Sequence, residues 1–301
     1  MRWWLPNRAM TTMAIVGVAL LVNGCEATAG GSPPTAENTP QAPVSAPEAP
    51  PAQSAAGFDG LDARVRQATA DAAKSGANIE TVVLDRDTGQ TVSNGVTKPF
   101  PIASVAKLFI ADDLLLQESQ GKTTLSPADR ASLDVMLRSS DDGAAQNFWN
   151  RSGGNAIIAR VKARYGLPGT TAPWNGHWDV TTSTASDLVH YYDMLLAGTG
   201  GLPPEQANVI IGDLAQSTPT GTDGYPQRFG IPEGLYAEPV AVKQGWFCCW
   251  SGPNQLHVST GVIGPEHRYV MAISSLDPTS AAAARTNMTQ AVKTMFPGGT
   301  I

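Results

Sequence analysis

The chain has 301 residues, of which 42% are hydrophobic and 15% are charged, and its formal net charge at pH 7 is −6. This acidic balance argues against a nucleic-acid partner, because phosphate backbones are bound by an excess of Lys and Arg. The length is sufficient for one large hydrophobic core together with terminal segments of a different kind.

The first 24 residues have the pattern of a secretion signal. Arg2 and Arg8 give a positive beginning, and residues 14–22 form an apolar stretch that is too short to span a bilayer. A small residue and then Cys25 follow, which resembles the lipobox of bacterial lipoproteins. The resemblance implies cleavage before Cys25, diacylglycerol on its thiol, and a chain anchored in the cell membrane that faces outside the cytoplasm. The alternative is an ordinary secretory signal with an incidental cysteine.

Residues 25–57 are predicted to be an extended tether. Residues 26–57 contain seven prolines with Ala, Ser, Thr and Gly, and almost no large apolar side chain. Such a segment cannot bury enough apolar surface to fold, and its prolines favour an extended chain. We expect it to hold the following domain, residues 58–301, away from the membrane among cell-wall material.

The folded region is predicted to begin with a helix and a hairpin. Apolar residues at helical spacing indicate a helix over 58–74, and strands are expected over 79–84 and 90–96, joined by turn residues. The next helix begins at Ser104 and is apolar nearly all round, so we expect it in the middle of the fold.

This apolar helix carries Ser104 and Lys107, which lie three residues apart and therefore on one face. Burial and the positive end of the helix dipole both disfavour the Lys107 ammonium. A neutral amine beside a hydroxyl is a general base beside a nucleophile. The pattern is also common by chance, and Ser119 with Lys122 repeats it in a polar stretch that is typical of a surface turn.

The rest of the chain is predicted to be a block of helices, then three strands, then a last helix. The helices are expected over 124–137, 155–165, 185–196 and 202–215, the strands over 237–250, 256–263 and 269–275, and the terminal helix over 280–296. In the first of these strands, Gly245 marks a place where another group must approach the backbone. The order indicates an α+β fold with one antiparallel sheet and a helical lobe.

Three short motifs occur in order along this region. They are Ser104-x-x-Lys107, Ser140-Asp141-Asp142 and Lys243-Gln244-Gly245. They resemble the SxxK, SDN and KTG motifs of the serine β-lactamase and penicillin-binding protein superfamily. From residue 58 to the C-terminus, the chain is most similar to the class A β-lactamase-related serine hydrolases. The resemblance implies a β-lactamase-like fold, with an antiparallel sheet flanked by terminal helices and an all-helical lobe.

The resemblance also implies acyl transfer. Ser104 would attack a carbonyl with Lys107 as base, and Ser140 would pass a proton to the leaving nitrogen. Lys243 would help to hold a substrate carboxylate and set the field around Ser140. The backbone N–H groups of Ser104 and Trp246 would form the oxyanion hole. The substrate would be a peptidoglycan peptide or a β-lactam.

The chain departs from the family pattern at three places. Asp142 stands where the pattern has Asn, and a carboxylate cannot donate to a substrate. Gln244 replaces Thr, and we expect this bulkier group beside the substrate pocket. Class A enzymes carry a Glu that drives deacylation by water, yet the interval from Ser119 to Pro204 contains no Glu.

The loop over 166–179 holds the nearest substitutes for that Glu, His177 and Asp179, but neither has the expected sequence setting. His177 is a candidate water-activating base. The favoured interpretation is a loop residue packed by Trp174 and Trp178. We therefore expect any acyl-enzyme to turn over slowly, as in a penicillin-binding protein.

The adjacent cysteines, Cys248 and Cys249, lie outside the cytoplasm in this interpretation, where thiols tend to oxidise. They could close a vicinal ring, but the alternation of a strand favours side chains on opposite faces. The four His are scattered and no ligand pair has zinc-like spacing, so no metal and no cofactor are expected.

Two functions follow from these residues. The first is a lipid-anchored, D,D-peptidase-like serine hydrolase that forms an acyl-enzyme with a peptide or β-lactam-like amide. The second is a catalytically weak or inactive lipoprotein of the same fold that binds cell-wall peptides or an envelope partner. The Ser104 and Lys107 pair favours the first, whereas Asp142 and the missing Glu favour the second. We expect a monomer.

Overall fold

The computed structural model describes residues 58–301. The predicted signal, Cys25 and the predicted tether lie outside the described residues. Within the part that is described, no helix combines the length and the hydrophobicity that a membrane crossing requires.

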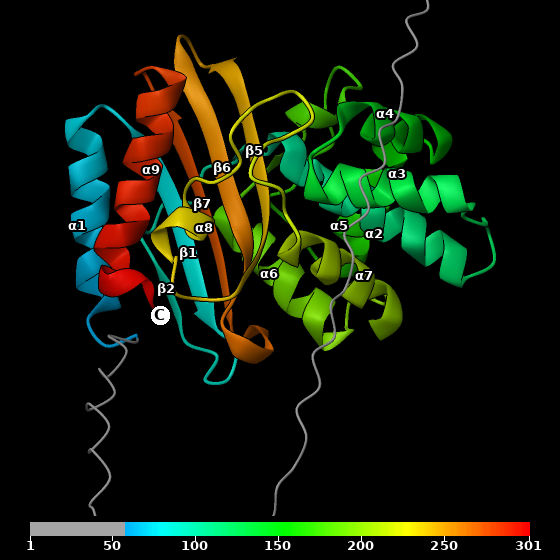
Figure 1. Ribbon diagram of the computed structural model, residues 1–301, viewed down its shortest axis with the longest axis horizontal. Coiled ribbons are helices and arrows are strands. Elements are labelled where there is room, and N and C mark those ends of the chain that lie inside the picture. The colour runs from blue at the N-terminus through cyan, green and yellow to red at the C-terminus, as the bar shows by residue number, and fades with distance from the viewer. Residues whose placement is uncertain (1–57) are drawn as a thin grey trace, which may run out of the picture. The chain divides into compact units, whose positions relative to one another are not determined.

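A five-stranded antiparallel sheet forms the centre of the domain (Figure 1), with the strand order β2-β1-β7-β6-β5. The strands are β1 (Asn78–Asp85), β2 (Thr91–Ser93), β5 (Val240–Trp250), β6 (Asn254–Ile263) and β7 (Tyr269–Asp277). The last three form a meander, in which Lys243 of β5 faces Thr260 of β6. The first strand pairs with β7, so that the two ends of the domain meet in one sheet.

The terminal helices α1 (Leu61–Lys74) and α9 (Ala281–Met295) pack together on one face of the sheet, as Figure 1 shows. The short helix α8 (Ile231–Gly234) lies against α9. Buried residues of α1, such as Leu61 and Val65, share one core with Val292 of α9. These positions follow the helical spacing that the sequence shows.

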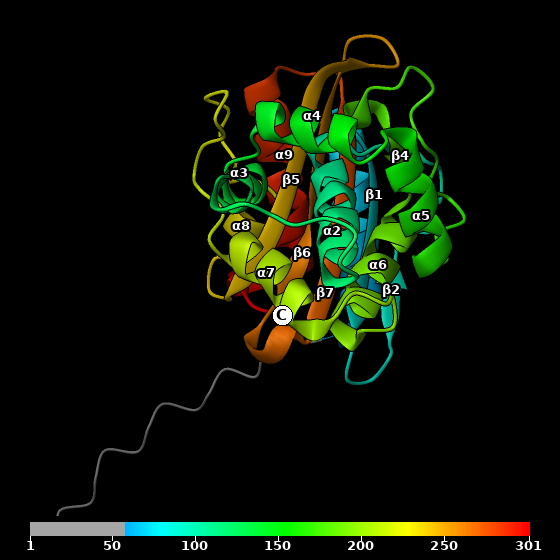
Figure 2. The same ribbon diagram turned by 90° about the vertical axis from the view of Figure 1, so that its right-hand side faces the viewer.

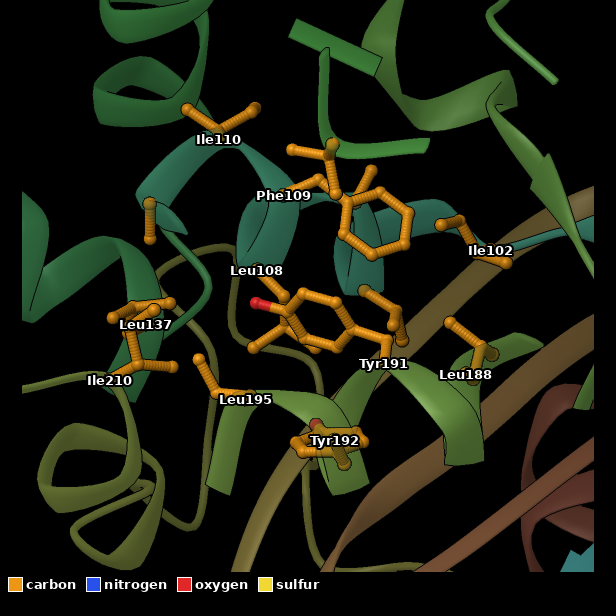
Figure 3. Close-up of a cluster of buried hydrophobic side chains, with 14 of the residues drawn as sticks. Ile102, Leu108, Phe109, Ile110, Leu137, Leu188, Tyr191, Tyr192, Leu195 and Ile210 are labelled. Atoms are coloured by element: carbon orange, nitrogen blue, oxygen red, sulfur yellow. The ribbon is translucent and has the colours of Figure 1, made fainter. Parts of the chain in front are cut away.

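The helical lobe covers the other face of the sheet and surrounds α2 (Figure 2). Its helices are α2 (Ala106–Ser119), α3 (Pro127–Arg138), α4 (Asp142–Arg151), α5 (Asn155–Tyr165), α6 (Ala185–Ala197) and α7 (Pro204–Ala215). Figure 3 shows the packing beside α2, where the rings of Phe109 and Tyr191 meet edge to face at 5.1 Å. The apolar sequence of α2 therefore reflects its central position.

Local signals explain where several helices begin. Ser126 and Asp129 form a capping box at the start of α3, with Pro127 in the first position. Thr184 caps α6 by accepting a hydrogen bond from the Asp187 amide. The expected helices and strands are confirmed within a few residues. At Ser104 the structure differs, because a 3-10 turn, η1 (Ala103–Val105), precedes α2.

Two adjacent carboxylates of α2 are buried in the helical lobe and pair with arginines of α5. Asp112 pairs with Arg164 and also accepts hydrogen bonds from the hydroxyls of Tyr165 and Tyr191. Arg160 reaches both oxygens of Asp113 at 2.7 Å. Because buried charges need partners, these pairs fix α5 against α2.

Candidate active site

Ser104 lies in η1, between the two-residue strand β3 (Phe100–Pro101) and α2. The residue is buried, with 7% exposure, and it lines a cavity of about 570 Å³. The preceding Ala103 has φ 47°, in the left-handed region that non-glycine residues rarely adopt. Such backbone is retained where the surrounding structure holds it, often at functional sites.

Lys107 is fully buried one turn after Ser104, and its amine contacts three oxygens. The distances from Nζ are 2.8 Å to Ser104 Oγ, 2.6 Å to the Ser140 carbonyl oxygen and 2.6 Å to Asp142 Oδ1. The ring centroid of Trp178 lies 4.6 Å from the same nitrogen. The amine is therefore enclosed, with Ser104 as one of its three polar neighbours.

Burial lowers the pKa of Lys107, although the neighbouring Asp142 carboxylate acts in the opposite direction. A neutral amine has two N–H groups and one lone pair. The Ser140 carbonyl and Asp142 Oδ1 can accept the two N–H groups, which leaves the lone pair facing the Ser104 hydroxyl. This arrangement is that of a general base beside a nucleophile.

Ser140 lies between two lysines at the junction of α3 and α4. Its carbonyl faces Lys107, and its Oγ lies 2.5 Å from Lys243 Nζ. The residue has φ 58°, so the chain reverses sharply just before Asp141 caps α4. The left-handed backbone turns the hydroxyl and the carbonyl of one residue toward different lysines.

Lys243 is buried, and neither it nor Ser140 lines the cavity. Burial, reinforced by the charge of Lys107, lowers its pKa well below the usual value for a lysine. Its Nζ also donates to the Gln244 carbonyl oxygen at 3.0 Å. Its only side-chain partner within residues 58–301 is the Ser140 hydroxyl, so a change in its charge acts first on Ser140.

Gly245 allows β5 to pass close to the segment that carries Ser104. A Cβ atom at this position would lie 2.5 Å from the Ile102 carbonyl oxygen, which is too close for any side chain. The expectation of a close approach at Gly245 is therefore confirmed, and the partner is the backbone that precedes the nucleophile.

The expectation that Gln244 stands beside the substrate pocket is wrong. Its side chain is buried on the other face of β5 and donates to the carbonyl oxygens of Gln227 and Phe229, at 3.0 and 2.7 Å. Alternation along the strand directs Lys243 and Gln244 to opposite faces. Gln244 therefore holds the chain before α8 against the sheet.

The loop before α6 contributes Trp178 and Asp179 to the cavity wall, but not His177. The expected packing of His177 by Trp174 and Trp178 is wrong. His177 is exposed, Trp174 is 83% exposed, and Trp178 is buried against Lys107. The short 3-10 helix Trp178–Val180 turns Trp178 inward and leaves His177 exposed to solvent.

Another part of the cavity wall is an aromatic platform of Tyr225 and Trp246, of which the sequence pointed only to Trp246. Tyr225 stacks on Trp246 with ring centroids 4.9 Å apart and an interplanar angle of 10°. The Trp246 indole donates to Asp223 Oδ2 at 3.1 Å, and the Tyr225 hydroxyl lies 2.7 Å from Nε2 of His257. An Asp-Gly pair at residues 223–224 signals a turn, but does not say where that turn lies.

The charge of the cavity wall is negative. Three carboxylates line it, those of Asp142, Asp179 and Asp223, whereas Lys107 and Lys243 are buried. No Arg or Lys lines the cavity among the described residues. The wall therefore favours cationic or neutral aromatic groups over an anion.

Cys248, which lines this cavity, forms a disulfide with Cys249, so the expectation that the two occupy opposite faces is wrong. The register of β5 against β6 shifts between Cys248 and Trp250, and this irregularity interrupts the alternation on which the expectation rested. The second Ser-x-x-Lys copy lies elsewhere. Ser119 and Lys122 are exposed at the end of α2 and do not line this cavity.

Comparisons with known proteins point to one group of relatives. No family model matches the sequence. Over 245 residues the chain is 64% identical to the protein named "Putative lipoprotein LppW" of Mycobacterium tuberculosis, and equally to that of Mycobacterium bovis. Each alignment covers 81% of this chain and 78% of the relative.

Solved structures of low sequence identity share the fold. TLA-3 extended-spectrum β-lactamase has a TM-score of 0.64 at 13% identity, over 79% of this chain and 98% of that chain. A class A β-lactamase from Mycobacterium abscessus has 0.61 at 20% identity, over 77% and 97%. A variant of PBP-A, solved as an acyl-enzyme complex with penicillin G, has 0.64 at 18% identity, over 79% and 95%. The expected β-lactamase-like α+β fold is thereby confirmed.

Proposed function

The chain belongs to the LppW family of lipoproteins, and we propose that it is a lipid-anchored serine hydrolase that forms an acyl-enzyme through Ser104. One observation carries the proposal. Lys107 Nζ lies 2.8 Å from Ser104 Oγ, in surroundings that lower the pKa of the amine and offer acceptors for its two remaining protons. The substrate would be a peptide or a β-lactam-like amide.

The proposed reaction begins when Ser104 Oγ attacks the substrate carbonyl carbon and its proton moves to Lys107 Nζ. The backbone N–H groups of Ser104 and Trp246 would stabilise the negative oxygen, and each such donor is typically worth about 100–1,000-fold in rate. Ser140 would give its proton to the leaving nitrogen as the carbon–nitrogen bond breaks. Lys243, which lies 2.5 Å from Ser140 Oγ, would stabilise the resulting oxygen.

Slow deacylation is part of the proposal. Hydrolysis of the ester needs a base that activates water on the acyl carbon. The segment between Ser119 and Pro204 contains no Glu, and the indole of Trp178 occupies the space beside Lys107. His177, the candidate base, is exposed and lines no part of the cavity. We expect the acyl-enzyme to persist.

The proposed location is the outer face of the cell membrane. It rests on the lipobox-like sequence at Cys25 and on the lipoprotein name that the relatives carry. We propose that residues 1–24 are removed, that residues 25–57 act as a tether, and that residues 58–301 are the hydrolase domain. This arrangement would present Ser104 to peptides of the cell wall.

The test is intact mass spectrometry of the full chain after incubation with a penicillin and, separately, with an uncharged activated ester. We expect a stable adduct with at least one reagent. The adduct should be lost in Ser104→Ala and retained in Ser119→Ala, which removes the exposed serine of the second Ser-x-x-Lys copy. Rapid hydrolysis of the penicillin without an adduct would overturn the proposal of slow turnover.

A second candidate is a protein that binds cell-wall peptides without turnover. The Asp142 carboxylate favours it, because it lies 2.6 Å from Lys107 Nζ and stabilises the protonated, non-basic form of the amine. Absence of both adduct and hydrolysis, together with saturable binding of a peptide that survives in Ser104→Ala, would support this function over the first.

A further inference from the structure

A second cavity, of about 450 Å³, lies on the same domain and shares no lining residue with the Ser104 cavity. Its walls come from α1, the start of β1, the end of β7, the segment before β3 and the tip of the β5–β6 hairpin. The volume is within the range of about 300–1,000 Å³ that is usual for small-molecule sites.

Glu80 lines this cavity and is incompletely satisfied. The residue is 3% exposed, and Oε1 accepts a hydrogen bond from the Ala185 amide at 2.8 Å. Within residues 58–301, the buried Oε2 has no hydrogen-bond partner. An unpaired buried polar atom is costly to maintain, so a bound group that pairs with Oε2 would be stabilised there.

The chemistry of Glu80 favours a hydroxyl as that group. Burial raises the pKa of Glu80 to about 7, so the carboxyl is protonated or ionised with similar ease near neutral pH. A hydroxyl can donate to the ionised form and accept from the protonated form, whereas an ammonium can only donate. Lys98, on the same wall, also opposes the binding of a cation.

The remaining walls combine aromatic rings with small polar groups. Trp250, which is partly buried on the hairpin, and Phe100, which is buried, both line the cavity. Asn78, Asn254 and Ser274 supply amides and a hydroxyl between them. A sugar ring has an apolar face of C–H groups and a rim of hydroxyls, which matches an aromatic wall bordered by amides and a carboxyl.

We propose that this cavity binds a neutral saccharide, with one hydroxyl on Glu80 Oε2 and a ring face on Trp250. The proposal does not depend on catalysis by Ser104. A free oligosaccharide and a polymer-bound glycan present the same hydroxyls and ring faces. Testing a soluble sugar and an insoluble polymer distinguishes these two sources of the ligand.

The test is a titration of the full chain with two soluble probes, the trimer of β-1,4-linked N-acetylglucosamine and maltotriose. Binding is monitored by calorimetry and by the indole N–H resonances in NMR spectra. The Trp250 resonance is assigned by its loss in Trp250→Phe. We expect saturable binding of at least one trimer that shifts this resonance. Cosedimentation with insoluble chitin then distinguishes a polymer-bound glycan from a free sugar.

Matched variants locate the site. Trp250→Ala should weaken binding at least about tenfold, and Glu80→Gln should weaken it while the amide keeps its contact with the Ala185 N–H. Trp174→Ala removes an exposed Trp that lines neither cavity and should change nothing. Ser104→Ala should also retain full binding, which separates this result from that of the hydrolase test.

Three results would overturn the proposal. One is the absence of binding of both trimers at millimolar concentration by a protein that is shown to be folded. Another is equal weakening by Trp250→Ala and Trp174→Ala. The third is a shift of the Trp250 resonance by a simple alkylammonium ion but by no sugar, since this result would assign the cavity to cations.

Discussion

Lys107 and Asp142 form an ion pair of unequal burial, with Nζ and Oδ1 2.6 Å apart. The lysine side chain is fully buried, whereas the aspartate side chain is 70% exposed. Burial lowers the pKa of Lys107 and the carboxylate raises it, so the two effects compete at the group that would activate Ser104. The balance between them determines the pH at which the amine becomes a base.

Replacement of the Asp142 carboxylate should make Lys107 a better base near neutral pH. In Asp142→Asn, burial is no longer opposed by this carboxylate, so the pKa of Lys107 falls and the midpoint of acylation moves to lower pH. A fall of one in this pKa gives about tenfold more neutral amine on the acidic limb. The measurement is the rate of adduct formation by intact mass as a function of pH.

Asp134→Asn is the control for this experiment, because it removes a carboxylate of α3 that lines neither cavity. It should leave the midpoint unchanged. A midpoint in Asp142→Asn that stays at its original pH, or moves upward, would show that Asp142 does not act on Lys107 through its charge.

The negative wall of the Ser104 cavity should select substrates by charge. Matched thioesters that carry an ammonium or a carboxylate should acylate Ser104 at different rates, with the cationic one faster. Asp223→Asn should reduce this ratio about fivefold, the effect of one partly exposed charge pair. Added salt should reduce the ratio in the same direction, because it screens exposed charges. A preference for the anionic thioester would contradict the prediction.

The buried carboxylate of Asp112 should be essential for the stability of the helical lobe. Asp112→Ala leaves the Arg164 guanidinium and two tyrosine hydroxyls without their shared acceptor. Removal of one partner of such a pair costs about 3–5 kcal/mol in the free energy of unfolding, which urea titration can measure. Asp71→Ala, in the exposed Asp71–Lys74 pair, is the control and should have little effect. Equal losses in the two variants would refute this role.

Glu80 should make the protein less stable as the pH rises. Its pKa is about 7 in the folded chain and 4.5 is the ordinary value. The contribution of Glu80 to the free energy of unfolding is therefore fully present below pH 4.5. It is lost as the pH rises through 7, and the loss is roughly 3 kcal/mol at most. We expect Glu80→Gln to remove most of this dependence in urea titrations at about pH 5 and about pH 8.

Glu205→Gln, which changes an exposed glutamate in the first turn of α7, is the matched control for Glu80. The free energy of unfolding should differ between the two pH values by as much in Glu205→Gln as in the unaltered protein. If Glu80→Gln behaves in the same way as this control, then ionisation of Glu80 is not coupled to unfolding.

Local sequence patterns are sufficient to predict the elements and their order. Helical and strand periods follow from local geometry, so the terminal helices, the meander and the apolar helix after Ser104 can be predicted from spacing alone. Capping at Ser126 and Thr184 is equally local. The pairing of Ser104 with Lys107 depends only on one helical turn, and for this reason it is visible in the sequence without knowledge of the fold.

Which distant side chains meet depends instead on how the elements pack. The contact between Lys107 and Asp142 requires the approach of α4 to α2, and the platform of Tyr225 and Trp246 requires the path of a loop. The inward turn of Trp178 also depends on neighbours far along the chain. Sequence patterns describe periodicity within an element, whereas contacts between elements are set by packing, which no local period encodes.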